Sequence, residues 1–98
     1  MHVAVIRIEL HLPVARSLKE KRAVLKPIVE GLRHRFSLSV AETDFHDKWQ
    51  RAEVGVAVVA ATAAHAQDVV DSVERWVWSR PDVEVCRFET GWPGAGSE

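Results

Sequence analysis

The order in which hydrophobic periodicity changes along this chain restricts its fold more than any other feature. Residues 3–12 alternate with period two, which is typical of a strand with one buried face. Five further segments are predicted in turn: a helix at 17–35, strands at 38–44 and 51–61, a helix at 64–80 and a strand at 83–89. With right-handed crossovers, this order predicts a ferredoxin-like α+β fold, β-α-β-β-α-β. Two helices would cover one face of a four-stranded antiparallel sheet of order 4-1-3-2.

Residues at the segment ends support these boundaries. Pro13 ends the first strand because proline cannot donate to a ladder, and Ser17 with Glu20 three residues later forms a capping-box pattern. Thr62 can cap the second helix, which Pro81 ends. The first and third strands are the most apolar, so we expect them at the centre of the sheet. The predicted core includes Ile6, Ile8, Leu25, Ile28, Leu32, Val56, Val58, Val69 and Val73.

The chain length of 98 residues fits one domain, which we expect to span residues 1–90. Residues 91–98 are rich in glycine and proline and are predicted to form a flexible C-terminal tail. Cys86 is the one cysteine, so no internal disulfide can form, and we expect its thiol to be buried or half-buried in the last strand. Without an export signal or a membrane-length apolar run, the expected location is the cytoplasm.

Positive charge is concentrated in the first predicted helix. Residues 16–35 carry a net charge of +5, whereas the rest of the chain carries -6. Such a helix can meet RNA phosphates and release counterions, but a solvated helix face accounts for the same residues. The candidate phosphate or RNA contacts are Arg16, Lys19, Lys21, Arg22, Lys26, Arg33 and Arg35.

The sheet face that the two helices leave uncovered is a second candidate surface. Aliphatic and charged side chains stand there where an RNA-recognition motif would place stacking aromatics, which argues against single-stranded RNA on this face. Small apolar groups fit a flat protein contact, so the sequence predicts a homodimer. The candidate dimer face comprises Val3, Val5, Arg7, Gly55, Ala57 and Val59.

No catalytic, cofactor or metal site is predicted, and neither is a small-molecule substrate. Polar residues gather between the second and third strands, but their spacing matches no ligand motif, and a polar turn with Trp49 folded back as an anchor explains them. No glycine-rich loop joins a strand to a helix, so nucleotide binding lacks its usual motif. Trp78 and Trp92 are either contact residues or partly shielded surface residues.

Several strings in this sequence resemble those of a known family. Ser17-Leu18-Lys19-Glu20-Lys21-Arg22 follows a strand that ends in His11-Leu12-Pro13, and Gly55-Val56-Ala57-Val58-Val59 follows Trp49. With residues 35–42, these strings resemble the YlxP-like family, domain of unknown function 503. The resemblance implies a small bacterial cytoplasmic protein of ferredoxin-like fold without an established activity. It also implies a gene neighbourhood shared with translation initiation factor two and ribosome-binding factor A, which suggests ribosome assembly or translation.

Three classes of function therefore stay open. The first is an accessory factor that associates with ribosomes or structured RNA through the basic helix. The second is a homodimeric protein-interaction module without nucleic-acid binding. The third is a small enzyme, which would need a pocket that joins Glu42, Asp44 or His46 to another polar strand end.

Overall fold

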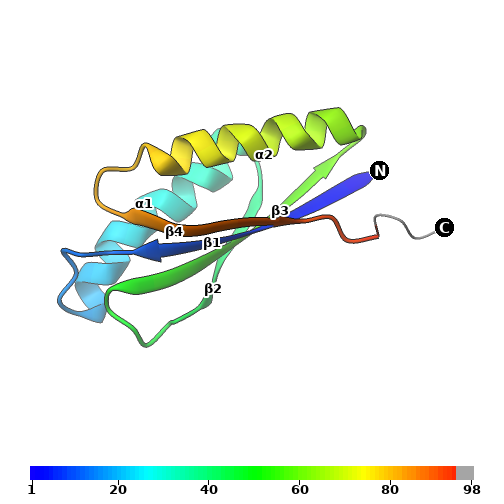
Figure 1. Ribbon diagram of the computed structural model, residues 1–98. Coiled ribbons are helices and arrows are strands. Elements are labelled where there is room, and N and C mark those ends of the chain that lie inside the picture. The colour runs from blue at the N-terminus through cyan, green and yellow to red at the C-terminus, as the bar shows by residue number, and fades with distance from the viewer. Residues whose placement is uncertain (95–98) are drawn as a thin grey trace.

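A computed structural model describes residues 1–94 and has the predicted order of elements. Figure 1 shows the two helices together on one side of the sheet. The elements are β1 (His2–His11), α1 (Leu18–Phe36), β2 (Ser39–Asp44), β3 (Arg51–Ala60), α2 (Ala63–Trp78) and β4 (Glu84–Gly91). Residues 95–98 of the predicted tail lie outside the described residues, whereas the last strand extends beyond its predicted end at Glu89 and Trp92 packs against the core.

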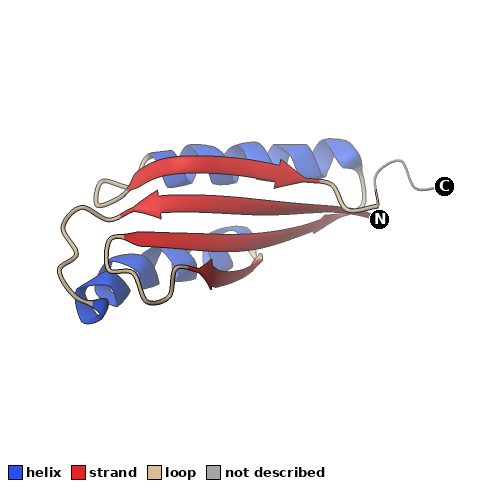
Figure 2. Ribbon diagram, turned by 60° about the horizontal axis from the view of Figure 1, so that its bottom comes forward, coloured by secondary structure: helices blue, strands red, loops and turns tan. Residues whose placement is uncertain are grey.

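The sheet has the order β2-β3-β1-β4 with antiparallel pairing throughout, which confirms the predicted topology. β1 pairs with β3 over its whole length, from His2 opposite Ala60 to His11 opposite Arg51. Both edge strands have an irregular register, β4 beside Glu9 and β2 at Thr43. In Figure 2 the strands lie in front of both helices, so one face of the sheet is without a covering helix.

Both helices begin where the sequence predicts a cap. The Ser17 side chain accepts a hydrogen bond from the backbone N–H of Glu20, and Thr62 accepts one from His65, each at 3.1 Å. The Glu20 carboxylate accepts from the backbone N–H of Arg16 at 2.7 Å, one residue before the position of a standard capping box. Because these backbone N–H groups are hydrogen-bonded to side chains, α1 begins directly after the loop that follows β1.

The core lies between the sheet and the two helices. Alternate residues of β1 and β3 face it, including Ile6, Ile8, Val56 and Val58. The prediction was wrong for Val69, which is half-buried at the edge of the core. The fully buried positions of α2 are Ala66, Val70, Val73 and Val77, because this helix is turned slightly from the expected angle.

The two helices contact each other through Gly31 of α1 and Trp76 of α2. A Cβ atom at residue 31 would lie 2.6 Å from the Trp76 indole, so only glycine leaves room for the ring. Phe36 meets the same indole edge to face, with 6.2 Å between ring centroids, and the Arg80 guanidinium lies over it at 4.2 Å. Glycine inside a helix is unfavourable by about 1 kcal/mol, and here the packing of Trp76 offsets that loss.

Substituting Gly31→Ala tests this packing. Alanine normally stabilises a helix interior, but here the added methyl group would displace the Trp76 ring, so we expect the free energy of unfolding to fall by about 1–3 kcal/mol. Urea denaturation followed by circular dichroism measures the change. In a Trp76→Ala background the clash is absent, and the same substitution should be neutral or stabilising. Destabilisation of equal size in both backgrounds would contradict the packing argument.

Candidate functional site

Four of the candidate phosphate contacts form one stripe on α1. Lys19, Arg22, Lys26 and Arg33 are all exposed, and their spacings of three, four and seven residues bring them to one face of the helix. We call these four residues the basic stripe. Its first and last residues, Lys19 and Arg33, are 14 positions apart, so it extends about 21 Å at 1.5 Å per residue. Arg22, Lys26 and Arg33 also line a shallow groove beside β2.

The basic stripe is largely unpaired. Among the ion pairs of residues 1–94, none involves Lys19, Arg22 or Lys26. One guanidinium nitrogen of Arg33 donates to the backbone oxygen of Val40 at 2.7 Å, which holds this side chain at the start of β2. Glu30 borders the same groove and lowers the net charge of this face to about +3. The face therefore remains positive and open to an anion.

Lys21, another candidate phosphate contact, is buried, and its inclusion among the surface contacts was wrong. Its residue exposure is 2%, and its Nζ lies 2.8 Å from Oε2 of Glu42. Nζ also donates to the backbone oxygen of Phe45 at 2.6 Å. Oε2 of Glu42 is buried and makes no directed hydrogen bond, so the ion pair is what compensates its charge.

A signal for this burial was present in the sequence. Lys21 stands four residues before Leu25, in the same helical row as the buried residues of α1. Glu42 stands two residues after the inward-facing Val40, so it points toward the same interior. A lysine in an apolar helical row and a glutamate in the inward phase of a strand together indicate a buried pair.

The last two candidate phosphate contacts lie apart from the stripe. Arg16 stands in the loop before α1, where its backbone N–H is held by Glu20. Arg35 is exposed, but it is two residues from Arg33 and therefore points to another side of the helix. The structure thus brings together four of the seven predicted cations.

All six residues of the candidate dimer face lie on β1 and β3, on the side away from the helices. Val5 and Val59 are the exposed large apolar residues among them, at 42% and 65%. Beside them is a shallow depression whose floor includes Gly55, Ala57 and Gly91. We call this side of the sheet the outer face.

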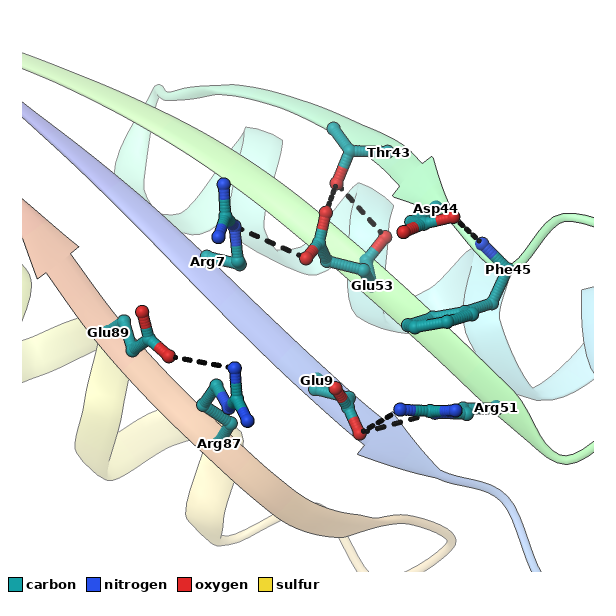
Figure 3. Close-up of polar contacts among 9 residues, drawn as sticks. All are labelled: Arg7, Glu9, Thr43, Asp44, Phe45, Arg51, Glu53, Arg87 and Glu89. Carbon is teal, nitrogen blue, oxygen red and sulfur yellow. Dashed lines mark hydrogen bonds and ion pairs between the residues drawn. The ribbon is translucent and has the colours of Figure 1, made fainter.

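Arginine and glutamate side chains alternate across the middle of the outer face, as Figure 3 shows. Arg7 pairs with Glu53 at 3.3 Å, and Arg51 pairs with Glu9 at 3.2 Å across β1 and β3. On β4, the guanidinium of Arg87 lies 3.1 Å from the carboxylate of Glu89. Because these charges neutralise one another, this face does not attract a polyanion.

The segment between β2 and β3 does not fold Trp49 back as an anchor, so that prediction was wrong. Trp49 is 54% exposed, although hydrogen bonds of Phe45 and Gln50 hold the backbone on either side of it. Phe45 has a positive φ of 61°, and its backbone oxygen accepts from both Lys21 and the N–H of Lys48. The Gln50 amide donates to the backbone oxygens of residues 13 and 15, at 3.2 and 3.0 Å.

A hollow lies beside Trp49 at this end of the outer face. It is lined by residues from β1, β3, β4 and the β2–β3 segment, including His11, Arg51 and Cys86. Cys86 is exposed, contrary to the burial predicted for it, because it falls at the irregular point of β4. Trp78 is also exposed, at 60%, on the helical side of the molecule.

Among residues 1–94, no three histidine, cysteine or acidic side chains gather closely enough to hold a metal ion. Neither α1 nor α2 is long and apolar enough to cross a membrane.

Residues 3–90 match the family model described as a protein of unknown function, DUF503. The chain belongs to this family. It is 36% identical over 78 residues to the uncharacterized protein YlxP of Bacillus subtilis (strain 168), and the match covers 80% of this chain and 85% of that protein. The resemblance seen in the sequence is confirmed. Neither description names an activity.

A solved structure with a similar fold is the solution NMR structure of a de novo designed protein, LFR1 1, with ferredoxin fold. It matches with a TM-score of 0.51 at 12% identity, covering 95% of this chain and 86% of the designed chain. At this identity the similarity concerns the fold alone. It confirms the ferredoxin-like architecture predicted from the order of strands and helices.

The buried pair of this DUF503 protein can be tested by Lys21→Met. The substitution leaves the Glu42 carboxylate without its cation, and the expected loss of unfolding free energy is about 2 kcal/mol. This is below the usual cost of breaking a buried pair because the Glu42 side chain is 26% exposed. Lys26→Met on the exposed side of the same helix is the matched control and should change stability by less than about 0.5 kcal/mol.

Urea denaturation of both variants measures the difference. Adding Glu42→Leu to Lys21→Met removes the unpaired carboxylate as well and should restore much of the lost stability. Equal stabilities for the Lys21 and Lys26 variants would show that the ion pair contributes nothing.

Proposed function

We propose that this protein is a non-enzymatic accessory factor that binds the phosphates of structured RNA through the basic stripe of α1. The observation that carries the proposal is the presence of four exposed cations on one helix face, none of which has a carboxylate partner among residues 1–94. Unpaired lysine and arginine side chains can neutralise phosphates without first breaking an internal ion pair. Ribosomal RNA is the structured RNA that we expect as the target.

The buried ion pair favours an anionic partner at this face. Glu42 borders the groove of the basic stripe, but its charge is balanced from below by Lys21. The cations that face solvent are therefore opposed mainly by Glu30. Arg33, fixed by its bond to the Val40 backbone, loses less conformational entropy on binding than a free arginine would.

The kind of RNA follows from the side chains that are present. α1 offers cations but no aromatic residue within the stripe on which an unpaired base could stack. Binding would therefore depend on phosphate geometry and little on base sequence. Double-stranded or compactly folded RNA presents such an array of phosphates.

Salt titration of RNA binding tests this proposal. A labelled RNA duplex of about 20 base pairs is titrated with the protein by fluorescence anisotropy at a series of KCl concentrations. Removing three cations together by Lys19→Ala, Arg22→Ala and Lys26→Ala should weaken binding more than tenfold at low salt. The same variant should lower the slope of log affinity against log salt by about three, one for each lost contact. Lys21 stays intact, so the fold is preserved.

A matched control removes the same charge elsewhere. Arg35, Lys48 and Arg75 are exposed and lie outside the stripe, so replacing all three with alanine changes net charge equally. This control should retain most of the wild-type affinity and slope. If both triple variants lose affinity equally, the binding is a general charge effect. If the wild-type protein does not bind RNA at low salt, the proposal is wrong and an interaction module without nucleic-acid binding takes its place.

A further inference from the structure

The two ends of the outer face differ in shape. At the end where β1 begins, the large apolar side chains of Val5 and Val59 project into solvent. At the end where β1 finishes, the hollow beside Trp49 is recessed between strands. In Figure 2 the first end lies on the right, beside the chain termini. The second end lies on the left, beside the loops that follow β1 and precede β3. The face therefore has projecting side chains at one end and a hollow at the other.

The Trp49 side chain is exposed, whereas hydrogen bonds hold the backbone that carries it. Lys21 and the Lys48 backbone N–H both donate to the Phe45 oxygen, and Gln50 ties the segment to the loop that follows β1. The Arg51 guanidinium lies over the Phe45 ring at 4.0 Å. A tryptophan presented in this way loses little conformational freedom on binding, and such residues contribute most to protein interfaces.

The charges of the outer face fit a surface of the same composition. Three arginines and three glutamates alternate there, in pairs that are already formed. A partner with a strong net charge of either sign gains nothing from this arrangement. A second copy, turned so that its arginines meet the glutamates of the first, has complementary charges and brings no net repulsion.

We propose that a second copy of this chain covers the outer face in an antiparallel arrangement. The two-fold axis runs across the strands and passes over the backbone of Ile8 and Val54, which face each other in the register of β1 and β3. Arg7 and Glu9 lie on either side of this level on β1, and Arg87 and Glu89 do so on β4, so the rotation places each of these arginines against a glutamate of the other copy. Rotation about this axis exchanges the two ends.

In this arrangement Val59 of each copy is placed against the Trp49 hollow of the other. The depression at Gly55, Ala57 and Gly91 lies near the axis, where small residues let the two sheets approach closely. From the standard strand spacings, the face is roughly 30 Å long and about 19 Å wide, a plane area of about 570 Å² that approaches the roughly 800 Å² that each partner of a standard interface buries. Both copies keep α1 on the outside, so this dimer does not depend on the RNA proposal.

The face is a better contact than the strand edges. The register of β4 is irregular beside Glu9 and that of β2 is irregular at Thr43. An irregular edge cannot extend the ladder evenly into a neighbouring molecule. A dimer could also form by pairing two sheets through their edge strands. The experiment must therefore distinguish that arrangement from contact through the outer face.

Light scattering on the full chain, with two charged variants, tests the dimer. The wild-type protein at micromolar concentration should have twice the 11.0 kDa mass of one chain. Val59→Lys and Trp49→Glu should each shift the mass to that of a monomer, with dimer affinity at least tenfold weaker. Both positions are exposed, so circular dichroism should show an unchanged fold. Val14→Lys, at an exposed valine outside the sheet, is the control and should leave the dimer intact.

Mixing the two variants tests the antiparallel register. In a mixed dimer the new lysine of one copy meets the new glutamate of the other, and the second Val59–Trp49 contact is unchanged. Equimolar mixing should therefore restore the double mass. Failure of mixing to restore it would overturn the antiparallel register, and a dimer that survives Val59→Lys would place the interface at a strand edge. A monomeric wild-type protein would overturn the proposal, whereas its RNA binding would be unaffected.

Discussion

The continuous pairing of β1 with β3 is the interaction on which the other features of the structure depend. Ten residues of each strand are in register, and alternate side chains of both are buried against the helices. A slip of one residue would move Ile6 and Ile8 to the outer face and bring charged residues such as Arg7 into the core. The same register therefore fixes the core on one side and the alternating charges on the other.

The fold could be predicted because its signals are local and consistent. Periodicity gave the element types, Ser17 and Thr62 gave the helix starts, and hydrophobicity placed the two central strands. The designed ferredoxin protein, at 12% identity, has the same architecture with few of the same residues. A pattern of this kind specifies a scaffold, whereas the function depends on which side chains the scaffold carries on its surface.

The candidate surfaces could be predicted only in part. Helical spacing alone brings together the basic stripe, and strand alternation alone brings together the residues of the outer face. Lys21 was misassigned because its charge was given more weight than its position in the buried row. The exposure of Trp49 could not be predicted, because the backbone that presents it is held by contacts with residues 13, 15 and 21, which no local pattern relates to it.

The contacts of the β2–β3 segment also bear on the order of folding. The bonds from Gln50 to the loop after β1 span 35 and 37 residues, and the bond from Lys21 to Phe45 spans 24. Closing such separations before β1 and β3 have paired is entropically unfavourable, so we expect these bonds to form after the folding barrier is crossed. Gln50→Ala should then raise the rate of unfolding and leave the rate of folding nearly unchanged in stopped-flow experiments; a slower folding rate would argue for earlier formation. The segment that presents Trp49 would thus prolong the lifetime of the native state without hastening its formation.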